Sequence, residues 1–541
     1  MRNIDHAKCS RLVRLGWIGV LAAAVSLGAL PALAQVRIVS VTGGRVEGVL
    51  SHGVVSFKGL AFAAPPVGRL RWRAPQPVVP WRGVKVADRF GPSCMQDPTF
   101  VRLFAAPPGL SEDCLYLNVW TPAKSPRAKL PVMVWIYGGG FVGGMTSIPV
   151  YDGTHFAQHG VILVSLGYRL GVFGFLADPA LSREQGGRSG NYGLLDMIAG
   201  LKWVRANIAK FGGDPSRVTV FGESAGGIAV SMLAVSPPAR GLFQRIICES
   251  GSDFAPARRA HEGGELIYPL AHAVAYGARF LARLGARTLA EARALPASVL
   301  EKAQGPGLQS GFWPVFDGRI LPGDEYRLYE ARRFIDTPVL IGTNSDEGSL
   351  FVRPGVTPAK FESQVRSQYG THAQAILAVY PHATNAEAEQ SAMDLSRDTN
   401  FAWGTWSWAR LETRYGHHRA YVYDFDHGTP HTPHEASHAS ELEFVFGNVG
   451  VPGGGPSGVQ GRPTPGDIAL SNLMIRYWTN FAKSGDPNGP GLPHWPAFRD
   501  PHAEVMGLDE HAAARPLPHL RKLEALDAYY AYRRAERRAA R

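Results

Sequence analysis

Residues 218–227 read VTVFGESAGG, and this stretch decides the fold class that we predict. Its first half, Val218–Phe221, is a short β-branched and aromatic run, which is typical of a buried strand. The pattern G-x-S-x-G follows at residues 222–226, and the apolar run Ile228–Ala234 predicts a helix. A strand, a serine between glycines and a helix form the context of a nucleophile elbow, a tight turn that lifts the serine above the sheet. A glycine turn around a non-catalytic serine is the alternative interpretation.

The segments around this stretch repeat the alternation of strand and helix. Apolar runs predict further strands at residues 130–137, 161–165, 335–341 and 421–423. Helical spacing of apolar residues predicts helices over 191–208 and 468–482, and the Gly/Pro-rich stretch 451–466 predicts a loop. This alternation predicts an α/β fold with a parallel central sheet flanked by helices. No linker divides the chain, so we expect residues 35–541 to form one large domain.

Composition and charge exclude several classes of protein. The chain has 541 residues, of which 45% are hydrophobic and 19% charged, which excludes a disordered or collagen-like chain. The formal net charge is +11. Residues 1–34 carry a net three of these charges and the basic tail 533–541 a net four. The rest is close to balanced and contains no nucleic-acid-binding motif, so we expect no nucleic-acid partner.

The N-terminus predicts export. Basic residues up to Arg14, an apolar run at 15–30 and an Ala-x-Ala exit ending at Ala34 are the three parts of a secretory signal peptide. The apolar run is short for a membrane span, which needs about 20 residues. We therefore expect cleavage near Ala34, a periplasmic or secreted protein, and no stable membrane anchor.

The cysteines are few. Cys9 lies in the predicted leader, Cys94 and Cys114 bracket a predicted surface loop, and Cys248 follows an apolar run and is expected to be a buried thiol. Export makes a disulfide chemically permissible.

A serine nucleophile needs a base and an oriented acid, which follow it in the order acid, then histidine, in α/β hydrolases. The sequence GTNSDEG at 342–348 comes directly after a predicted strand, but its position does not choose between Asp346 and Glu347 as the acid. His438 precedes ELEFVFG at 441–447 and is a candidate base. The turn YGGGF at 137–141 can offer backbone N–H groups to an oxyanion. No Lys-Ser/Thr pair follows it, so it is not a P-loop.

Four histidines cluster near the candidate base. Prolines and a glycine interrupt this stretch, which argues against the ordered geometry that a zinc site needs. We therefore expect loop histidines, one of them catalytic, and neither a metal nor a cofactor. The four are His427, His431, His434 and His438.

Two long motifs carry a resemblance to a known family. They are FGGDPSRVTVFGESAGG at 211–227 and EDCLYLNVWTP at 112–122, with shorter matches at 61–68, 313–318 and 477–488. Through them the chain resembles the type-B carboxylesterases, the family of cholinesterases and bacterial para-nitrobenzyl esterases. The resemblance spans most of the chain after residue 34 and implies an α/β-hydrolase fold.

The resemblance also implies roles for individual residues. It makes Ser224 the nucleophile, Glu347 rather than Asp346 the acid, and His438 the base. The other residues it implies are the oxyanion donors Gly139, Gly140 and Ala225, the supporting residues Glu223, Ser250 and Asp398 near the triad, and a disulfide between Cys94 and Cys114.

These residues together predict an exported serine hydrolase that acts on a small-molecule carboxylic ester through an acyl-enzyme. Related amides or carbonates are possible substrates of the same chemistry. A non-catalytic cholinesterase-like binding protein is the alternative, but such relatives typically lack a triad member, and here all three are present. The loop Met95–Asp113 contains no tryptophan, which disfavours choline esters because cation–π binding prefers that side chain.

Overall fold

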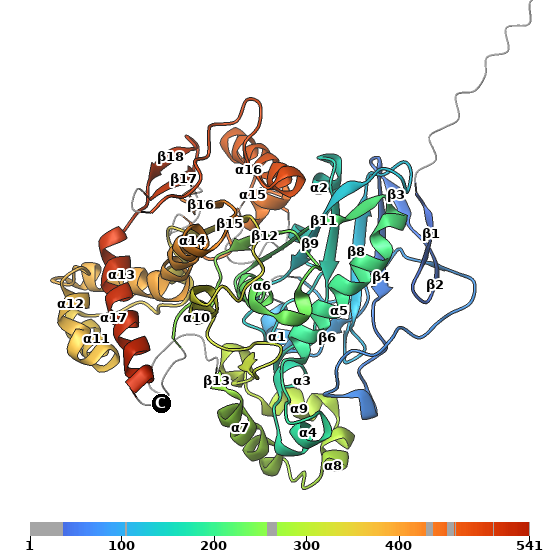
Figure 1. Ribbon diagram of the computed structural model, residues 1–541, viewed down its shortest axis with the longest axis horizontal. Coiled ribbons are helices and arrows are strands. Elements are labelled where there is room, and N and C mark those ends of the chain that lie inside the picture. The colour runs from blue at the N-terminus through green and yellow to red at the C-terminus, as the bar shows by residue number, and fades with distance from the viewer. Residues whose placement is uncertain are drawn as a thin grey trace, which may run out of the picture. The chain divides into compact units, whose positions relative to one another are not determined.

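One large sheet carries the candidate site. The computed structural model describes residues 36–102, 105–256, 268–428, 436–451, 459, 461–500 and 503–539. The strands of the sheet, from one edge to the other, are β18 (Ala513–Pro516), β17 (Glu504–Leu508), β16 (Ala420–Phe425), β15 (Val339–Asn344), β12 (Arg245–Glu249), β11 (Gly213–Glu223), β9 (Leu130–Ile136), β10 (Ile162–Leu166), β8 (Tyr116–Thr121), β4 (Val54–Ala61) and β3 (Val49–Ser51) (Figure 1).

The centre of this sheet is parallel, as the alternation of strands and helices predicts. The seven strands from β17 to β10 run parallel to their neighbours, and only the pairings at the two edges are antiparallel. Every residue of β10, β15 and β16 is buried, so both faces of the sheet are covered there. Parallel strands end at one edge, and the loops after β11, β15 and β16 carry Ser224, Glu347 and His438.

Most predicted strands are confirmed, with one correction. The strand expected over 335–341 begins only at Val339 and continues to Asn344. Pro338 has no N–H group to donate to a sheet ladder, although its carbonyl accepts the N–H of Ile246.

The helices are as follows: α1 (Pro98–Val101), α2 (Thr154–Gln158), α3 (Gly171–Phe175), α4 (Pro179–Glu184), α5 (Tyr192–Asn207), α6 (Ala225–Val235), α7 (Leu270–Arg283), α8 (Leu289–Ala294), α9 (Ala297–Ala303), α10 (Glu325–Glu330), α11 (Pro358–Tyr369), α12 (Ala373–Leu377), α13 (Asn385–Arg397), α14 (Trp403–Tyr415), α15 (Leu442–Phe446), α16 (Pro465–Ser484) and α17 (Leu520–Ala539). The remaining short strands are β1 (Ile38–Val41), β2 (Gly44–Glu47), β5 (Val84–Val86), β6 (Ser93–Cys94), β7 (Leu110–Ser111), β13 (Tyr268–Pro269) and β14 (Val315–Phe316).

Helix α16 begins earlier than expected, inside the stretch predicted as a loop. Thr464 and Asp467 cap it reciprocally, because each side chain accepts the backbone N–H of the other residue. This capping box shortens the predicted loop at its C-terminal end, and residues 452–458 and 460 of that loop lie outside the described residues.

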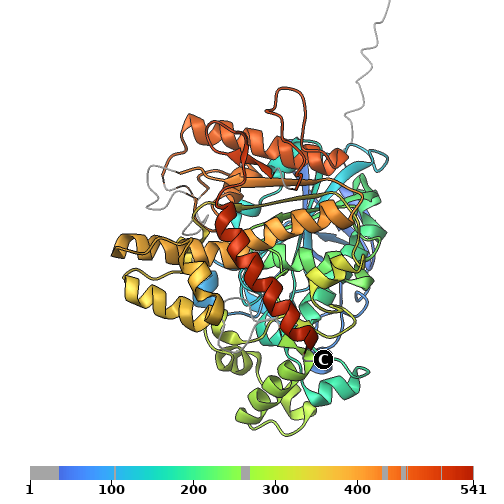
Figure 2. The ribbon, with the colours of Figure 1, turned by 60° about the vertical axis from the view of Figure 1, so that its left-hand side comes forward.

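The C-terminal helix α17 lies beside α12 and α14 (Figures 1 and 2). Arg533 and Arg534, from the predicted basic tail, are buried in this contact. The guanidinium of Arg534 lies 3.6 Å from the ring centre of Tyr326 and donates a hydrogen bond to the carbonyl of Phe254. Arg534 therefore helps to dock α17, whereas Arg533 donates a hydrogen bond to Tyr529 of the same helix.

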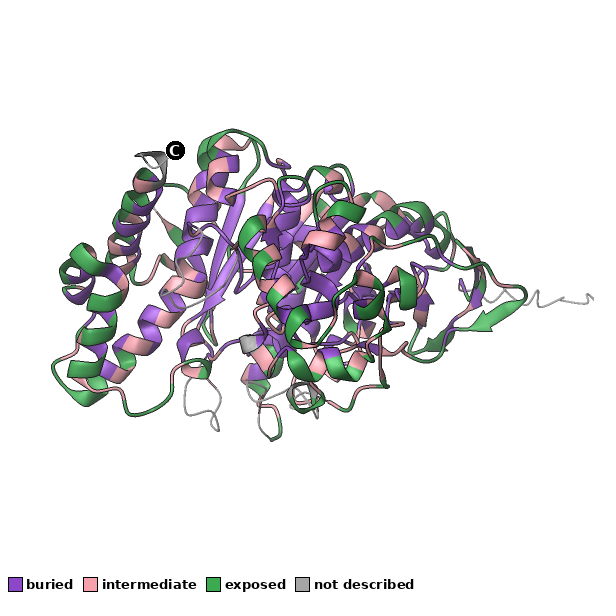
Figure 3. Cartoon of the chain, turned by 90° about the horizontal axis from the view of Figure 1, so that it is seen from below, coloured by how far each residue is buried: buried purple, intermediate pink, exposed green. Residues whose placement is uncertain are grey.

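The buried residues concentrate along the sheet and on the helix sides that face it (Figure 3). Cys94 and Cys114 form the disulfide that the resemblance implies, and Cys248 is a free, buried thiol in β12. Within the ranges that the structure describes, we find no helix long and apolar enough to cross a membrane.

Candidate active site

The strand β11 ends in a strained turn that presents Ser224. This serine has φ 54° and ψ −126°, and α6 starts at the next residue. Its N–H group donates to the carbonyl of Glu249 at 2.9 Å, which ties the turn to β12. A Cβ at Gly226 would lie 2.0 Å from the carbonyl oxygen of Ile136, and one at Gly222 would lie 2.6 Å from it. The two glycines are thus required by the close approach of β9, and the turn has the strand–serine–helix geometry of an elbow.

The candidate acid and base meet directly. Glu347 opens a short 3₁₀ turn after β15, and its Oε1 accepts the N–H of Asn344 at 2.9 Å. Its Oε2 lies 2.5 Å from Nδ1 of His438. Asp346 instead pairs through its backbone, whose N–H donates to the carbonyl of Ala436. The tertiary structure therefore places Glu347, and not Asp346, at the imidazole.

The other nitrogen of the imidazole faces the elbow. Nε2 of His438 lies 3.1 Å from Oε1 of Glu223, the residue before the serine. Among the residues that the structure describes, Oγ of Ser224 forms no hydrogen bond. Such contacts are often long in free enzymes and tighten when substrate binds.

A glycine turn lies against the elbow. A Cβ at Gly138 would lie 2.6 Å from Oε2 of Glu223 and 2.9 Å from Cβ of Ser224, so only a glycine allows this approach. Gly139 and Gly140 follow with φ values of 96° and 62°, and their N–H groups have no acceptor among the described residues. Ala225 is the first residue of α6, where N–H groups have no intrahelical partner. The three predicted oxyanion donors thus come from two turns that pack together.

Two phenylalanines hold the imidazole. The ring of Phe401 is stacked on that of His438 at 4.7 Å and 24°, and Phe351 meets it edge-on at 5.1 Å. Phe401 belongs to a π-helical turn, Asp398–Ala402, between α13 and α14. Neither ring was singled out from the sequence, which offers no signal that connects residue 401 with residue 438.

Buried carboxylates dominate the electrostatics of the site. Burial raises the pKa of Glu223 to about 8. Burial and the neighbouring Glu347 raise the pKa of Glu441 to about 7, although Glu441 also accepts a 2.6 Å hydrogen bond from Nδ2 of Asn344. Burial alone would lower the pKa of His438, but Glu223 and Glu347 outweigh it and raise this pKa to about 9. The site is thus built to favour a protonated imidazole, the species that forms when a histidine takes a proton from serine.

Glu441 and Asn344 are further residues of the site that were not singled out as such. Asn344 holds Glu347 with its N–H group and Glu441 with its amide. Asn344 lies three positions before Glu347, and Glu441 lies three positions after His438. That spacing was the available signal.

The two other supporting residues lie one step further from the triad. Ser250 has φ 47°, donates its N–H to the carbonyl of Gly342, and follows the glutamate that anchors the elbow. Asp398 pairs with Nε of Arg397 at 2.8 Å, and Nη1 of Arg397 donates to the carbonyl of Ser345. Asp398 is thus linked through Arg397 to the chain just before Glu347.

Of the clustered histidines, His427 is buried and bonds through Nε2 to Oδ1 of Asp467 at 2.6 Å. His427 is thus a loop histidine, as expected, and its contact ties the loop after β16 to Asp467 of the capping box of α16. His431 and His434 lie outside the described residues. The described part of the chain holds no group of three or more side chains arranged for a metal ion.

Comparisons with known proteins agree with this geometry. The profile of the Carboxylesterase family matches residues 35–525. The chain is 38% identical to a fumonisin B1 esterase of Sphingopyxis macrogoltabida, over 86% of this chain and 84% of the relative. It is 35% identical to the para-nitrobenzyl esterase of Bacillus subtilis, over 91% and 98% of the two chains. It is 34% identical to the acetylcholinesterase of Bungarus fasciatus, over 92% and 87%.

Solved structures extend the likeness to three dimensions. A structure of PNB esterase matches with a TM-score of 0.79 and 35% identity, covering 91% of this chain and 99% of that one. This match shows that the mixed sheet and its helices form an α/β-hydrolase fold. The family profile covers most of the chain, and its relatives are themselves esterases. The chain therefore belongs to the carboxylesterase family and is a carboxylesterase.

Proposed function

We propose that this carboxylesterase works through an acyl-enzyme on Ser224. The observation that carries the proposal is the contact of Glu347 with Nδ1 of His438, with Nε2 turned toward the elbow. That arrangement leaves Nε2 as the nitrogen that faces the serine side of the site. The carboxylate behind it selects the tautomer and stabilises the positive charge that proton transfer creates.

The proposed reaction has two matched halves. His438 takes the proton of Ser224 while the hydroxyl oxygen attacks the ester carbonyl, and the N–H groups of Gly139, Gly140 and Ala225 stabilise the resulting oxyanion. The C–O bond to the alcohol then breaks, and His438 gives its proton to the leaving oxygen. Water repeats the sequence on the acyl-enzyme, which releases the carboxylic acid and restores the serine.

Replacement of the nucleophile tests this mechanism. We expect Ser224→Ala to remove turnover of para-nitrophenyl acetate and covalent labelling by a fluorophosphonate, while the circular dichroism spectrum is retained. The matched control is Ser216→Ala, an exposed serine in the same strand, β11, which should behave as wild type. A wild-type protein with no fluorophosphonate adduct at Ser224 would contradict the acyl-enzyme mechanism.

The proposed substrates are small-molecule carboxylic esters other than choline esters. The described relatives include both a fumonisin esterase and an acetylcholinesterase, so family membership alone does not choose between ester types. The stretch Met95–Asp113, closed by the disulfide, lacks the tryptophan that would bind a quaternary ammonium. We expect kcat/KM for acetylthiocholine to fall well below that for phenyl thioacetate, and the reverse order would contradict this proposal.

We also propose that the protein is exported and that residues 1–34 are removed. The three-part N-terminus supports this proposal, and the Cys94–Cys114 disulfide is compatible with an oxidising compartment. Mass spectrometry of the mature protein from its host should give an N-terminus near Gln35, and an intact leader on the purified enzyme would contradict it.

A further inference from the structure

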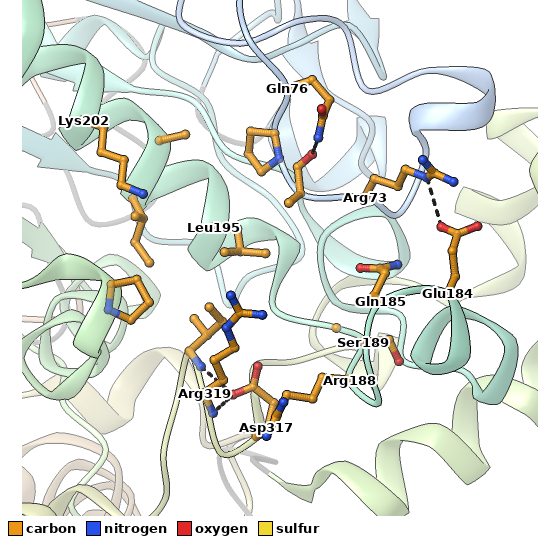
Figure 4. A pocket seen from close by; sticks show the side chains of 17 residues that line it. Arg73, Gln76, Glu184, Gln185, Arg188, Ser189, Leu195, Lys202, Asp317 and Arg319 are labelled. Carbon is orange, nitrogen blue, oxygen red and sulfur yellow. Dashed lines mark hydrogen bonds and ion pairs between the residues drawn. The ribbon is translucent and has the colours of Figure 1, made fainter.

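A second cavity lies among elements that carry none of the triad or oxyanion residues. Its volume is about 540 Å³, within the range of about 300–1,000 Å³ that small-molecule sites occupy. Figure 4 shows its walls: the chain at 73–76, the loop after α4, one side of α5, and the loop after β14. Leu195, Ile198, Ala199 and Lys202 line it from α5 at helical spacing, so a single face of this helix forms one wall.

Both carboxylates of the cavity already accept hydrogen bonds from the protein. Glu184 forms two 2.8 Å bonds with Arg293 and a 3.0 Å bond with Arg73. These hydrogen bonds lower its pKa to about 2. Oδ1 of Asp317 accepts the backbone N–H groups of residues 319, 320 and 321. Glu184 is therefore neutralised by two arginines, whereas Asp317 is held by neutral N–H groups and keeps its charge.

Two cations of the cavity remain uncompensated. The side chains of Lys202 and Arg319 form no ion pair or hydrogen bond with any described residue. Figure 4 shows them directed into the same space from different elements, α5 and the loop after β14. Arg188 adds a third cation on the rim, held by a 3.0 Å bond from its Nε to the carbonyl of Asp317. The lining thus carries four basic side chains against two acidic ones, which leaves an excess of positive charge.

Much of the remaining lining is apolar, beside the polar side chains of Gln76, Gln185 and Ser189. Between the cations lie the side chains of Leu195, Ile198, Pro238 and Ile320, of which Ile198 and Ile320 are buried. A hydrated inorganic anion would leave this surface uncovered, whereas an anion with a hydrocarbon body would bury it. A carboxylate also matches the fork of a guanidinium.

We propose that this cavity is a binding site for a small organic carboxylate with an apolar body, separate from the catalytic centre. Lys202 and Arg319 bind the carboxylate, and the apolar side of α5 with Pro238 and Ile320 receives the hydrocarbon. The proposal needs no catalytic step, so it stands or falls independently of the acyl-enzyme mechanism.

Calorimetric titration of the full-length Ser224→Ala protein tests the proposal, because this variant cannot turn over any ester product. Three probes are compared: octanoate, its uncharged analogue octanamide, and inorganic phosphate. The test variant is Lys202→Gln/Arg319→Gln. The matched control is Lys210→Gln/Arg333→Gln, which removes the same two charges from exposed side chains outside the cavity.

We expect octanoate to bind in preference to octanamide and to phosphate, and to bind about ten-fold more weakly to the test variant than to the control. Ala199→Glu, which adds a carboxylate to the partly exposed wall of α5, should weaken octanoate binding without altering the fold. Equal octanoate affinity in the test and control variants would overturn the proposal. So would octanamide binding as tightly as octanoate, or phosphate binding as tightly as octanoate.

Discussion

Replacing Glu223 by glutamine should move the pH dependence of the enzyme to lower pH. Oε1 of Glu223 lies 3.1 Å from Nε2 of His438, and this carboxylate is the largest of the influences that raise the pKa of the imidazole. The proposed reaction requires neutral His438 as its base, so kcat/KM falls as the pH drops below the pKa of His438. Removing the carboxylate lowers this pKa, and activity should then persist further into acid.

The distance sets the size of the effect. Two unit charges 3.1 Å apart attract by about 5 kcal/mol at an effective dielectric constant of about 20. That would equal about four pH units at about 1.4 kcal/mol each, and it is an upper bound. Burial raises the pKa of Glu223 itself to about 8, so part of this attraction offsets the cost of ionising a buried carboxylate. We therefore expect the acidic limb to move by about one to two pH units.

The assay is kcat/KM for a para-nitrobenzyl ester between pH 5 and pH 10, because the alcohol of such an ester does not ionise in this range. The matched control is Glu412→Gln, which replaces another buried glutamate whose pKa burial also raises, beside Tyr329 and away from His438. The control should keep the wild-type limb. If the acidic limb of the kcat/KM profile is unchanged in Glu223→Gln, or shifts equally in the control, the reasoning is refuted.

Three further variants test the scaffold of the site. Cys94→Ser/Cys114→Ser opens a loop with a sequence separation of 20, and urea denaturation should show a loss of about 3 kcal/mol in the free energy of unfolding. Phe401→Leu removes the ring stacked on His438; a loss of about 1 kcal/mol of positioning would lower kcat about five-fold with little change in KM. Gly226→Ala places a Cβ 2.0 Å from a carbonyl oxygen of β9, so fluorophosphonate labelling should fall sharply even in folded protein. Wild-type stability in the cysteine variant, wild-type kcat in Phe401→Leu, or wild-type labelling in Gly226→Ala would contradict the corresponding expectation.

The elbow could be predicted from the sequence because all of its parts are local. Gly222, Ser224 and Gly226 follow a strand and precede a helix within a few residues, and the strain at Ser224 depends on those neighbours. The strand boundary at residue 339 was predicted less well. Pro338 has no N–H group to donate to the ladder, so the strand begins after it although the apolar run starts earlier, and pairing with the neighbouring strands extends it to Asn344.

The residues alone do not decide which carboxylate is the acid of the triad, because Asp346 and Glu347 are adjacent on one turn. Only the position of His438, which lies 91 residues from Glu347, decides which carboxylate meets the imidazole. The same holds for Phe401, whose π-helical turn has no pattern that points to a histidine.

The fold class, the nucleophile turn and the family can be predicted from the sequence alone, because they depend on short motifs and on the periodicity of apolar residues. The environment of those residues depends on the folded chain. The tertiary structure brought the ends of parallel strands to one edge, buried Glu223 and Glu441 beside His438, and left Lys202 and Arg319 uncompensated around an apolar wall. A pKa or an unpaired charge depends on groups that converge from distant parts of the chain, and on the water that their packing excludes.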